Sequence, residues 1–298
     1  MTPAISLAGL TRRYHDQLAL DDVTFEIEGA SITGLLGRNG AGKTTLMRTI
    51  AAQEFASAGS VRVFGDSPFE DDAVLRRIAL VREDQIFPAL RVRHVLRTAS
   101  WFYPNWDGHL AAGLLADFDL PLNRFVTRLS RGMRSALGIV IGLASRAELT
   151  LFDEPYSGLD AAARQLFYDR LLADFAEHPR TVLVSTHLID EAADLLERVL
   201  VIDRGRIVLD AAAEDLRGAA TTVSGTTPAV EEFVAGRTVW DRRRVGSQAS
   251  LVVAGALDDG DRARARRLNL SLTPVSLQQL VTHVPTGATR DPREDSRA

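Results

Sequence analysis

The segment that most constrains the fold is residues 37–44, Gly-Arg-Asn-Gly-Ala-Gly-Lys-Thr, which matches the pattern G-x-x-x-x-G-K-[ST]. An apolar run at 32–36 precedes it, and a helix-like stretch to residue 52 follows it. Glycines allow successive backbone N–H groups to point into one concavity, to which the following helix adds its positive end. The order strand, glycine loop, helix therefore predicts a loop that binds the phosphates of a nucleoside triphosphate.

Lys43 is the single lysine of the chain. A compact ammonium fits between phosphate oxygens where a planar guanidinium is bulkier. We therefore expect Lys43 to bridge the β- and γ-phosphates of ATP, and the Thr44 hydroxyl to ligate Mg²⁺. The residues expected to contact the nucleotide here are Gly37, Asn39, Gly40, Ala41, Gly42, Lys43, Thr44 and Thr45.

Composition is that of an ordinary globular protein. The 298 residues are 46% apolar and include no cysteine, which excludes disulfides and thiolate metal sites. A net charge of −4 does not favour nucleic acid as a partner. The longest strongly apolar run, 137–144, is far shorter than the about 20 residues of a membrane-spanning helix. No signal peptide is evident at the N-terminus.

The apolar pattern predicts an α/β fold. Strand-like runs at 149–152, 181–185 and 199–202 alternate with helical stretches, which indicates a mainly parallel sheet with helices on both faces. A half-buried strand is expected earlier, at 23–27, and further strands at 61–64 and 78–81.

The chain changes character near 210–217, where we place a domain boundary. The predicted division is a nucleotide-binding domain at 1–217, a small α+β domain at 218–285 and a disordered tail at 286–298. Within the small domain a strand is expected at 251–253 and a helix at 258–268, and Ser276 and Gln279 have capping-box spacing.

Two acids, Asp153 and Glu154, end the apolar run at 149–152. Ligands of parallel sheets bind at the carboxyl ends of the strands. We expect Asp153 to hold Mg²⁺ and Glu154 to act as the general base that polarises the attacking water. Shortly before this run, Ser130 in Leu-Ser-Arg-Gly-Met is placed to cap a helix, whose remaining free N–H groups could receive a phosphate.

As a set, these motifs resemble the ABC-type P-loop ATPases over roughly residues 5–210. Residues 129–133 match the family's LSGGQ signature, 157–160 match the loop after the acidic strand, His187 matches the switch histidine and Tyr14 the aromatic that stacks on adenine. The resemblance implies an antiparallel β subdomain and a helical signature subdomain near 85–135. It also implies a head-to-tail dimer, in which Ser130 and Gly132 of one subunit complete the ATP site of the other.

In that arrangement His187 would contact the γ-phosphate, and Asp160 would communicate across the interface. The resemblance further implies a separate integral membrane permease as partner. The ATPase would then lie on the cytoplasmic face of the membrane, peripheral through the permease and paired with a second copy or a paralogue. Export is the expected direction, because the closest resemblance is to exporter ATPases.

Two departures from the family pattern stand out. Arg131 and Met133 replace the second glycine and the glutamine of the signature. The family's coupling-loop glutamine, a ligand near Mg²⁺, corresponds to Glu83 by strand register, whereas Gln85 keeps the residue type with a shift. We favour Glu83, and a carboxylate there would act as a charged ligand instead of a neutral amide.

Other features leave alternatives open. The aromatic stretch 101–106 fits either a groove for a permease helix or the core of the helical subdomain. The arginines at 242–244 and 262–267 stand among acids, which favours a solvated face over a nucleic-acid patch. A soluble ABC ATPase of ribosomes or DNA is the second hypothesis, and a non-hydrolysing regulatory binder is the third. The single phosphate loop and the intact Glu154 argue against them.

Overall fold

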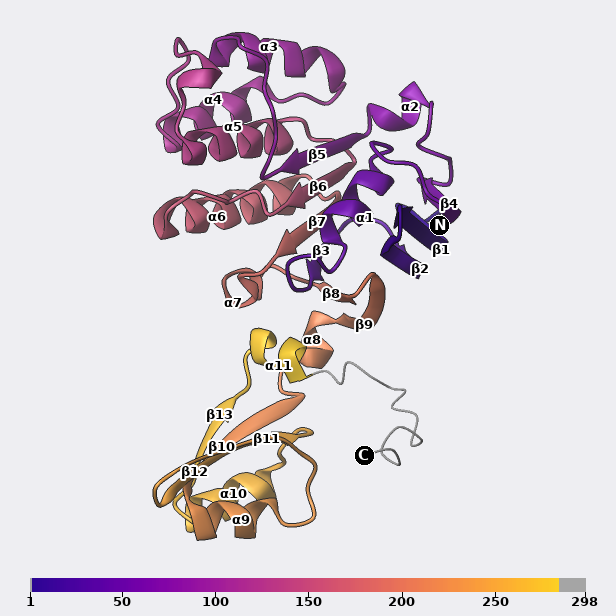
Figure 1. Ribbon diagram of the computed structural model, residues 1–298. Coiled ribbons are helices and arrows are strands. Elements are labelled where there is room, and N and C mark those ends of the chain that lie inside the picture. Colours follow the sequence, from indigo (N-terminus) through magenta and orange to yellow (C-terminus); the bar gives the residue numbers. More distant parts are fainter. Residues whose placement is uncertain (1, 284–298) are drawn as a thin grey trace. The chain divides into compact units, whose positions relative to one another are not determined.

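The computed structural model describes residues 2–283, with side chains to 280. The chain forms two compact units that divide between Asp210 and Ala211 (Figure 1), slightly before the boundary predicted at 217. Each unit is described by itself. No helix in the described range is long and apolar enough to cross a membrane. The tail predicted at 286–298 lies outside the described residues.

A six-stranded sheet forms the centre of the first unit, with strand order β5-β6-β7-β3-β8-β9. The strands are β3 (Ser31–Leu36), β5 (Ile78–Arg82), β6 (Leu149–Asp153), β7 (Thr181–Thr186), β8 (Arg198–Asp203) and β9 (Arg206–Ala212). The pairs β5/β6, β6/β7, β3/β7 and β3/β8 are parallel. β9 follows β8 through the two-residue turn Arg204-Gly205, and so short a connection makes this edge pair antiparallel.

Helices pack on both faces of this sheet because its middle strands, β6 and β7, are buried along their whole length. Leu149 and Leu151 face a core that includes Leu46 of α1 (Lys43–Ile50). On the other face the Phe152 ring meets Phe167 of α6 (Ala161–Glu177) edge-on, with centroids 5.2 Å apart. The predicted α/β class with a mainly parallel sheet is confirmed.

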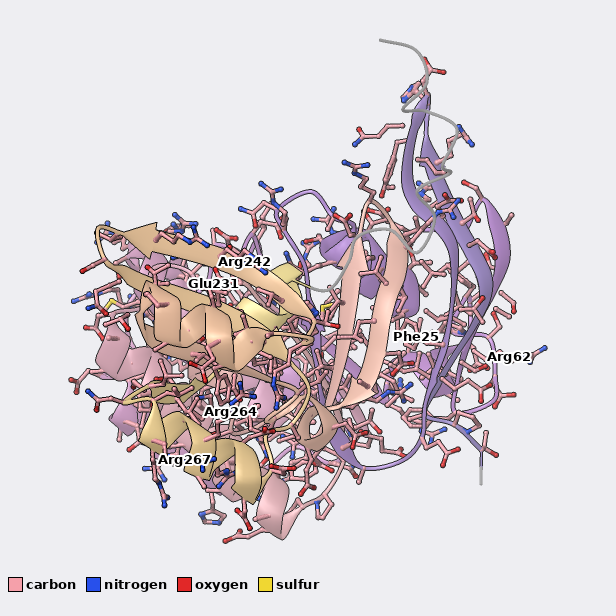
Figure 2. All side chains as sticks on the ribbon, turned by 90° about the horizontal axis from the view of Figure 1, so that it is seen from below. Phe25, Arg62, Glu231, Arg242, Arg264 and Arg267 are labelled. Carbon is pink, nitrogen blue, oxygen red and sulfur yellow. The ribbon has the colours of Figure 1, made fainter. Side chains whose placement is uncertain are left out.

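A three-stranded antiparallel sheet, ordered β2-β1-β4, shares the core that covers α1. Its strands are β1 (Ile5–Tyr14), β2 (Gln17–Ile27) and β4 (Ala58–Val63). Alternation gives it one apolar face: Phe25 is buried, whereas Arg62 is exposed and points outward in Figure 2. The short helix α2 (Asp72–Leu75) leads from this sheet to β5.

Helices occupy the stretch between β5 and β6 (Figure 1). They are α3 (Val92–Phe102), α4 (Gly108–Asp117), the 3₁₀ turn η1 (Val126–Arg128) and α5 (Arg131–Ala144). α5 packs on α3 and α4 and also on β5 and β6, so it ties this helical part to the sheet. In the aromatic stretch Trp101 and Phe102 are about two-thirds exposed, and Tyr103 and Trp106 are half-buried. Two of these rings are thus exposed and two are partly packed, which agrees with a groove for a permease helix and with a place in the core of the helical subdomain.

The second unit has the order β10-α9-β11-β12-α10-β13 and an antiparallel sheet ordered β11-β12-β10-β13, the ferredoxin-like arrangement. Its strands are β10 (Ala220–Thr226), β11 (Val239–Val245), β12 (Gln248–Ala254) and β13 (Ser271–Pro274). Its helices are α8 (Ala213–Leu216), α9 (Thr227–Val234), α10 (Asp259–Arg267) and α11 (Leu277–His283).

Alternation along β12 builds two small cores in this unit. Leu251 and Val253 pack with Phe233 of α9, and Val252 packs on the other face with Leu280. The predicted capping box at Ser276 and Gln279 is present, and a second one at Asp258 starts α10. Glu231 accepts hydrogen bonds from Arg242 and Arg244, and Figure 2 shows Glu231 beside Arg242.

Candidate functional site

The glycine loop leaves β3 and delivers Lys43 to the first position of α1. Gly42 adopts φ +115°, and a Cβ there would lie 2.7 Å from the carbonyl oxygen of Ala19, so a side chain is excluded. No side chain caps this helix, which leaves its first N–H groups available to a ligand. The buried Lys43 Nζ donates to the carbonyl oxygens of Gly37 (2.8 Å) and Arg38 (3.3 Å).

A cavity of about 440 Å³ opens beside this loop. It is lined by Tyr14, Gln17, Ala19, Asn39, Gly40, Gly42, Lys43, Thr44, Thr45, Arg48, Glu83, Asp84, Asp153 and Glu154. Of the predicted contact residues, Gly37 and Ala41 belong to the loop without lining the cavity. Tyr14 reaches it from the β1–β2 hairpin, with the Arg12 guanidinium 4.5 Å from its ring centroid. The local loop, the distant aromatic and the two acids thus meet at one place.

The acids come together at the carboxyl end of β6. Asp153 is buried and accepts a hydrogen bond of 2.7 Å from Ser185 Oγ, which in turn accepts one of 3.0 Å from the Glu154 backbone N–H. Glu154 has φ +46°, a left-handed conformation that costs energy for a glutamate. That backbone turn places the Glu154 carboxylate between Lys43 Nζ (3.3 Å) and His187 Nδ1 (3.0 Å).

Asp153 differs from the other carboxylates of the cavity because it has no ion pair with a cation among the side chains described, those of residues 2–280. The exposed hydroxyl of Thr44 lines the same cavity. Carboxylate and hydroxyl oxygens that line one cavity are the kind of donors that Mg²⁺ prefers. The residues present therefore fit a magnesium ion.

Glu83 and Gln85 have different surroundings. Glu83 follows the last residue of β5, and its backbone N–H donates to the carbonyl oxygen of Asp153 (3.1 Å). Glu83 lines the nucleotide cavity and also the neighbouring one. Gln85 lines this neighbouring cavity, where its Oε1 lies 3.4 Å from the position that a Cβ on Gly138 of α5 would take. Glu83, the residue that strand register favours, is the one at the nucleotide cavity.

Ser130, Gly132 and Asp160 do not line the cavity. Ser130 caps α5, as predicted, by accepting from the Met133 N–H (3.2 Å), and Asp160 caps α6 by accepting from the Ala163 N–H (2.8 Å). A Cβ on Gly132 would come within 2.4 Å of the Gly158 carbonyl oxygen, so the start of α5 packs closely on the loop before α6. Within one chain these predicted residues are therefore not part of the cavity that Lys43 and Glu154 line.

Sequence reasoning missed several residues of the site. Gln17, Ala19, Arg48 and Asp84 line the cavity, and Ser185 holds both acids. Ser185 stands opposite Asp153 in the parallel β6/β7 register, so strand pairing is the signal that could have found it. Arg48 lies one helical turn after Thr44, on the same face of α1, which was a usable signal.

The phosphate loop, the parallel sheet and the acids at the strand ends define a P-loop nucleotide-binding protein. A family model described as ABC transporter matches residues 20–157. The aliphatic sulfonates import ATP-binding protein SsuB 1 of Nocardia farcinica is 34% identical over 210 residues, covering 70% of this chain and 82% of that protein. The Nod factor export ATP-binding protein I of Ralstonia nicotianae is 32% identical over 226 residues, covering 72% and 69%.

A solved structure described as the ATP binding subunit of an ABC transporter is also similar, with a TM-score of 0.65 at 25% identity, covering 72% of this chain and 91% of that one. The chain belongs to the ATP-binding subunits of ABC transporters, the family that hydrolyses ATP to drive transport. The transporter hypothesis is thereby supported over the ribosome or DNA alternative.

Proposed function

We propose that this chain hydrolyses ATP at the cavity around Lys43 and that Glu154 is the general base. The observation that carries this proposal is the position of Glu154, whose carboxylate lies 3.3 Å from Lys43 Nζ and 3.0 Å from His187 Nδ1 at the rim of the loop. A carboxylate between a phosphate-binding ammonium and an imidazole is well placed to orient a water molecule toward the γ-phosphate.

Each group of cavity residues has its own role in binding and hydrolysis of ATP. The uncapped N–H groups of α1 and Lys43 bind the phosphates, and Tyr14 stacks on the adenine. Thr44 and Asp153 would hold Mg²⁺, Glu83 lines the same cavity, and Ser185 fixes the Asp153 carboxylate. The metal ion, when bound, neutralises charge that develops on the phosphates. Binding of ATP moves Lys43 from Glu154 to the phosphates, which frees the Glu154 carboxylate for water.

We further propose a head-to-tail dimer. Ser130, Gly132 and Asp160 lie outside the cavity of their own chain, as expected if they serve the site of a second subunit. ATP binding would close this dimer and hydrolysis would reopen it. Two intact half-sites on one chain permit a homodimer, and a paralogous partner is the other possibility.

The partner that receives this motion is proposed to be a separate integral membrane permease, which would hold the ATPase at the cytoplasmic face of the membrane. Exposed apolar side chains of the helical part suit such docking: Ile86 is 92% exposed, and Trp101 and Phe102 are 67% and 61% exposed. Export is the proposed direction. Of the two relatives described above, one is named for import and one for export, so both directions of transport occur among the relatives of this chain.

The substitution Glu154→Gln tests the proposed base. We expect the ATP turnover number to fall by about 100-fold or more, while ATP still binds and the ATP-bound dimer lives longer. Glu148→Gln, which removes a surface carboxylate paired with Arg77 (2.7 Å), is the matched control and should leave turnover unchanged. Unchanged turnover and dimer lifetime in Glu154→Gln would exclude Glu154 as the base.

The transport partner is tested by purification from membranes. A multi-span membrane protein should co-purify with the tagged chain in detergent, and Ile86→Asp should weaken that association without changing basal ATPase activity. Sedimentation of the chain with ribosomes instead would contradict the proposed partner.

A further inference from the structure

The two departures from the family pattern contact each other. Arg131, at the start of α5, donates hydrogen bonds from Nη2 to Glu83 Oε1 and to Ser157 Oγ, the latter at 2.7 Å. Ser157 Oγ donates to the same Glu83 oxygen at 2.7 Å. Three segments distant in sequence, namely the loop after β5, the signature and the loop before α6, therefore meet on one carboxylate.

The cavity lining contains four carboxylates, and three of them have a cation partner. Glu154 pairs with Lys43 at 3.3 Å, and Asp84 pairs with Arg48 at 3.0 Å. Glu83 pairs with Arg131. The fourth carboxylate, Asp153, is the one that we propose binds Mg²⁺. Unlike Lys43 and Arg48, Arg131 does not line this cavity; it lines the neighbouring cavity, which Glu83 also lines.

A glutamate at this position faces an electrostatic problem. Mg-free ATP carries about four negative charges near neutral pH, and an unpaired carboxylate in the same cavity repels them. A neutral amide, the residue type that the family resemblance implies here, would not. An adjacent guanidinium cancels the charge of Glu83 and, through its planar array of donors, also fixes the direction of the carboxylate.

We propose that Arg131 is a positioning residue for ATP binding: it neutralises Glu83 of its own chain and holds that carboxylate toward Ser157, away from the phosphates. The positive charge of Arg131 thus compensates for the negative charge that glutamate brings to position 83. This inference rests on the proposed ATP site around Lys43, and it gives Arg131 a role within its own chain, apart from the signature's proposed role across the dimer.

The test is a double-mutant cycle read by ATP binding. ATP affinity is measured calorimetrically in EDTA, so that no metal ion contributes, at concentrations where sedimentation shows a monomer. Arg131→Gln should weaken ATP binding by about tenfold, equivalent to about 1.4 kcal/mol. Glu83→Gln should stay within about twofold of wild type, and so should the double variant Glu83→Gln/Arg131→Gln, because no charge is left to compensate.

Two further variants separate charge from structure. Arg131→Lys keeps the positive charge and should retain most of the affinity. Arg134 lies in the same first turn of α5 but forms no ion pair with Glu83. The variant Arg134→Gln should therefore bind ATP as wild type does. Thermal melts of all variants check that each is folded.

The outcomes are distinct. If Arg131→Gln binds ATP as tightly as wild type in the monomer, or if the double variant stays as weak as Arg131→Gln, the inference is overturned while the ATP site stands. If wild type itself binds no ATP in the monomer, and Lys43→Ala changes nothing, the proposed ATP site fails and the inference fails with it.

Discussion

The two units of this protein are both built from layers of helix and sheet, but only the first buries polar and charged side chains among the residues described. The buried polar and charged side chains of the described residues all belong to the first unit, among them Lys43, Asp153 and Ser185. In the second unit the described arginines and acids stay outside the cores, as in the Glu231–Arg242 pair. Burial of charge is costly, so the first unit gives up stability that the second retains.

Strand direction explains where this charge collects. In the parallel sheet the carboxyl ends of β3, β6 and β7 lie at one edge, which brings Lys43, Asp153 and His187 to the same place. In the antiparallel sheet neighbouring strands end at opposite edges, so polar strand ends do not converge. We therefore expect the first unit to respond to substitutions in activity and the second mainly in stability.

The largest expected effect is that of Lys43→Arg. The guanidinium cannot take the compact position in which Nζ reaches the carbonyl oxygen of Gly37 at 2.8 Å, so we expect ATP hydrolysis to fall by about 100-fold or more. Phosphate release measures this, and a thermal melt near the wild-type value separates it from misfolding. Near-normal ATPase activity would contradict the assignment of the whole site.

Phe233→Ala examines the other side of the comparison. The ring is fully buried in the core of the second unit, so its loss should reduce the free energy of unfolding of that unit by about 3–5 kcal/mol. ATP hydrolysis per folded molecule should not change. Val245→Ala, at a position 82% exposed on β11, is the control and should be neutral in both measurements. A large loss of ATPase activity in Phe233→Ala would show that the second unit acts on the site.

Ser185→Ala sharpens the comparison inside the first unit. It removes the hydroxyl that bonds Asp153 and the Glu154 N–H, at a cost of about 1–3 kcal/mol, and turnover should fall about tenfold because both acids lose their support. Thr33→Val on β3 is the matched control, since its buried hydroxyl has no hydrogen-bond partner within the described part of the chain. Equal turnover in the two variants would leave Ser185 without a positioning role.

The smallest expected effect is that of Asp258→Ala in the second unit. Its carboxylate caps α10 by accepting from the Asp261 N–H at 2.7 Å, so the stability of this unit should fall by about 1 kcal/mol with ATPase activity unchanged. Asp259→Ala removes a neighbouring acid that makes no cap and should cost less. Chemical denaturation measures the free energy of unfolding of both variants. Equal losses of stability would mean that the negative charge near the helix dipole, and not the cap, stabilises α10.

Prediction from sequence succeeded where the information is local. The phosphate loop, the Ser130 cap and the capping box at Ser276 each lie within a few residues, so their geometry follows from short-range hydrogen bonding. Prediction missed β11, because its run Asp241-Arg242-Arg243-Arg244 reads as a solvated charged segment. It is an edge strand that pairs with β12 on one side only, and charge is common on such strands.

What the sequence determined by itself was the class of chemistry. The contiguous residues from Gly37 to Thr44 follow a strand and precede a helix, and this order is enough to form a phosphate-binding loop, because backbone N–H groups bind the phosphates. Only the tertiary structure put Glu83, and not Gln85, at the nucleotide cavity, joined Ser185 to Asp153 and paired Arg131 with Glu83. Those contacts join segments up to tens of residues apart, and their partners are set by strand register and helix packing, which no local pattern encodes.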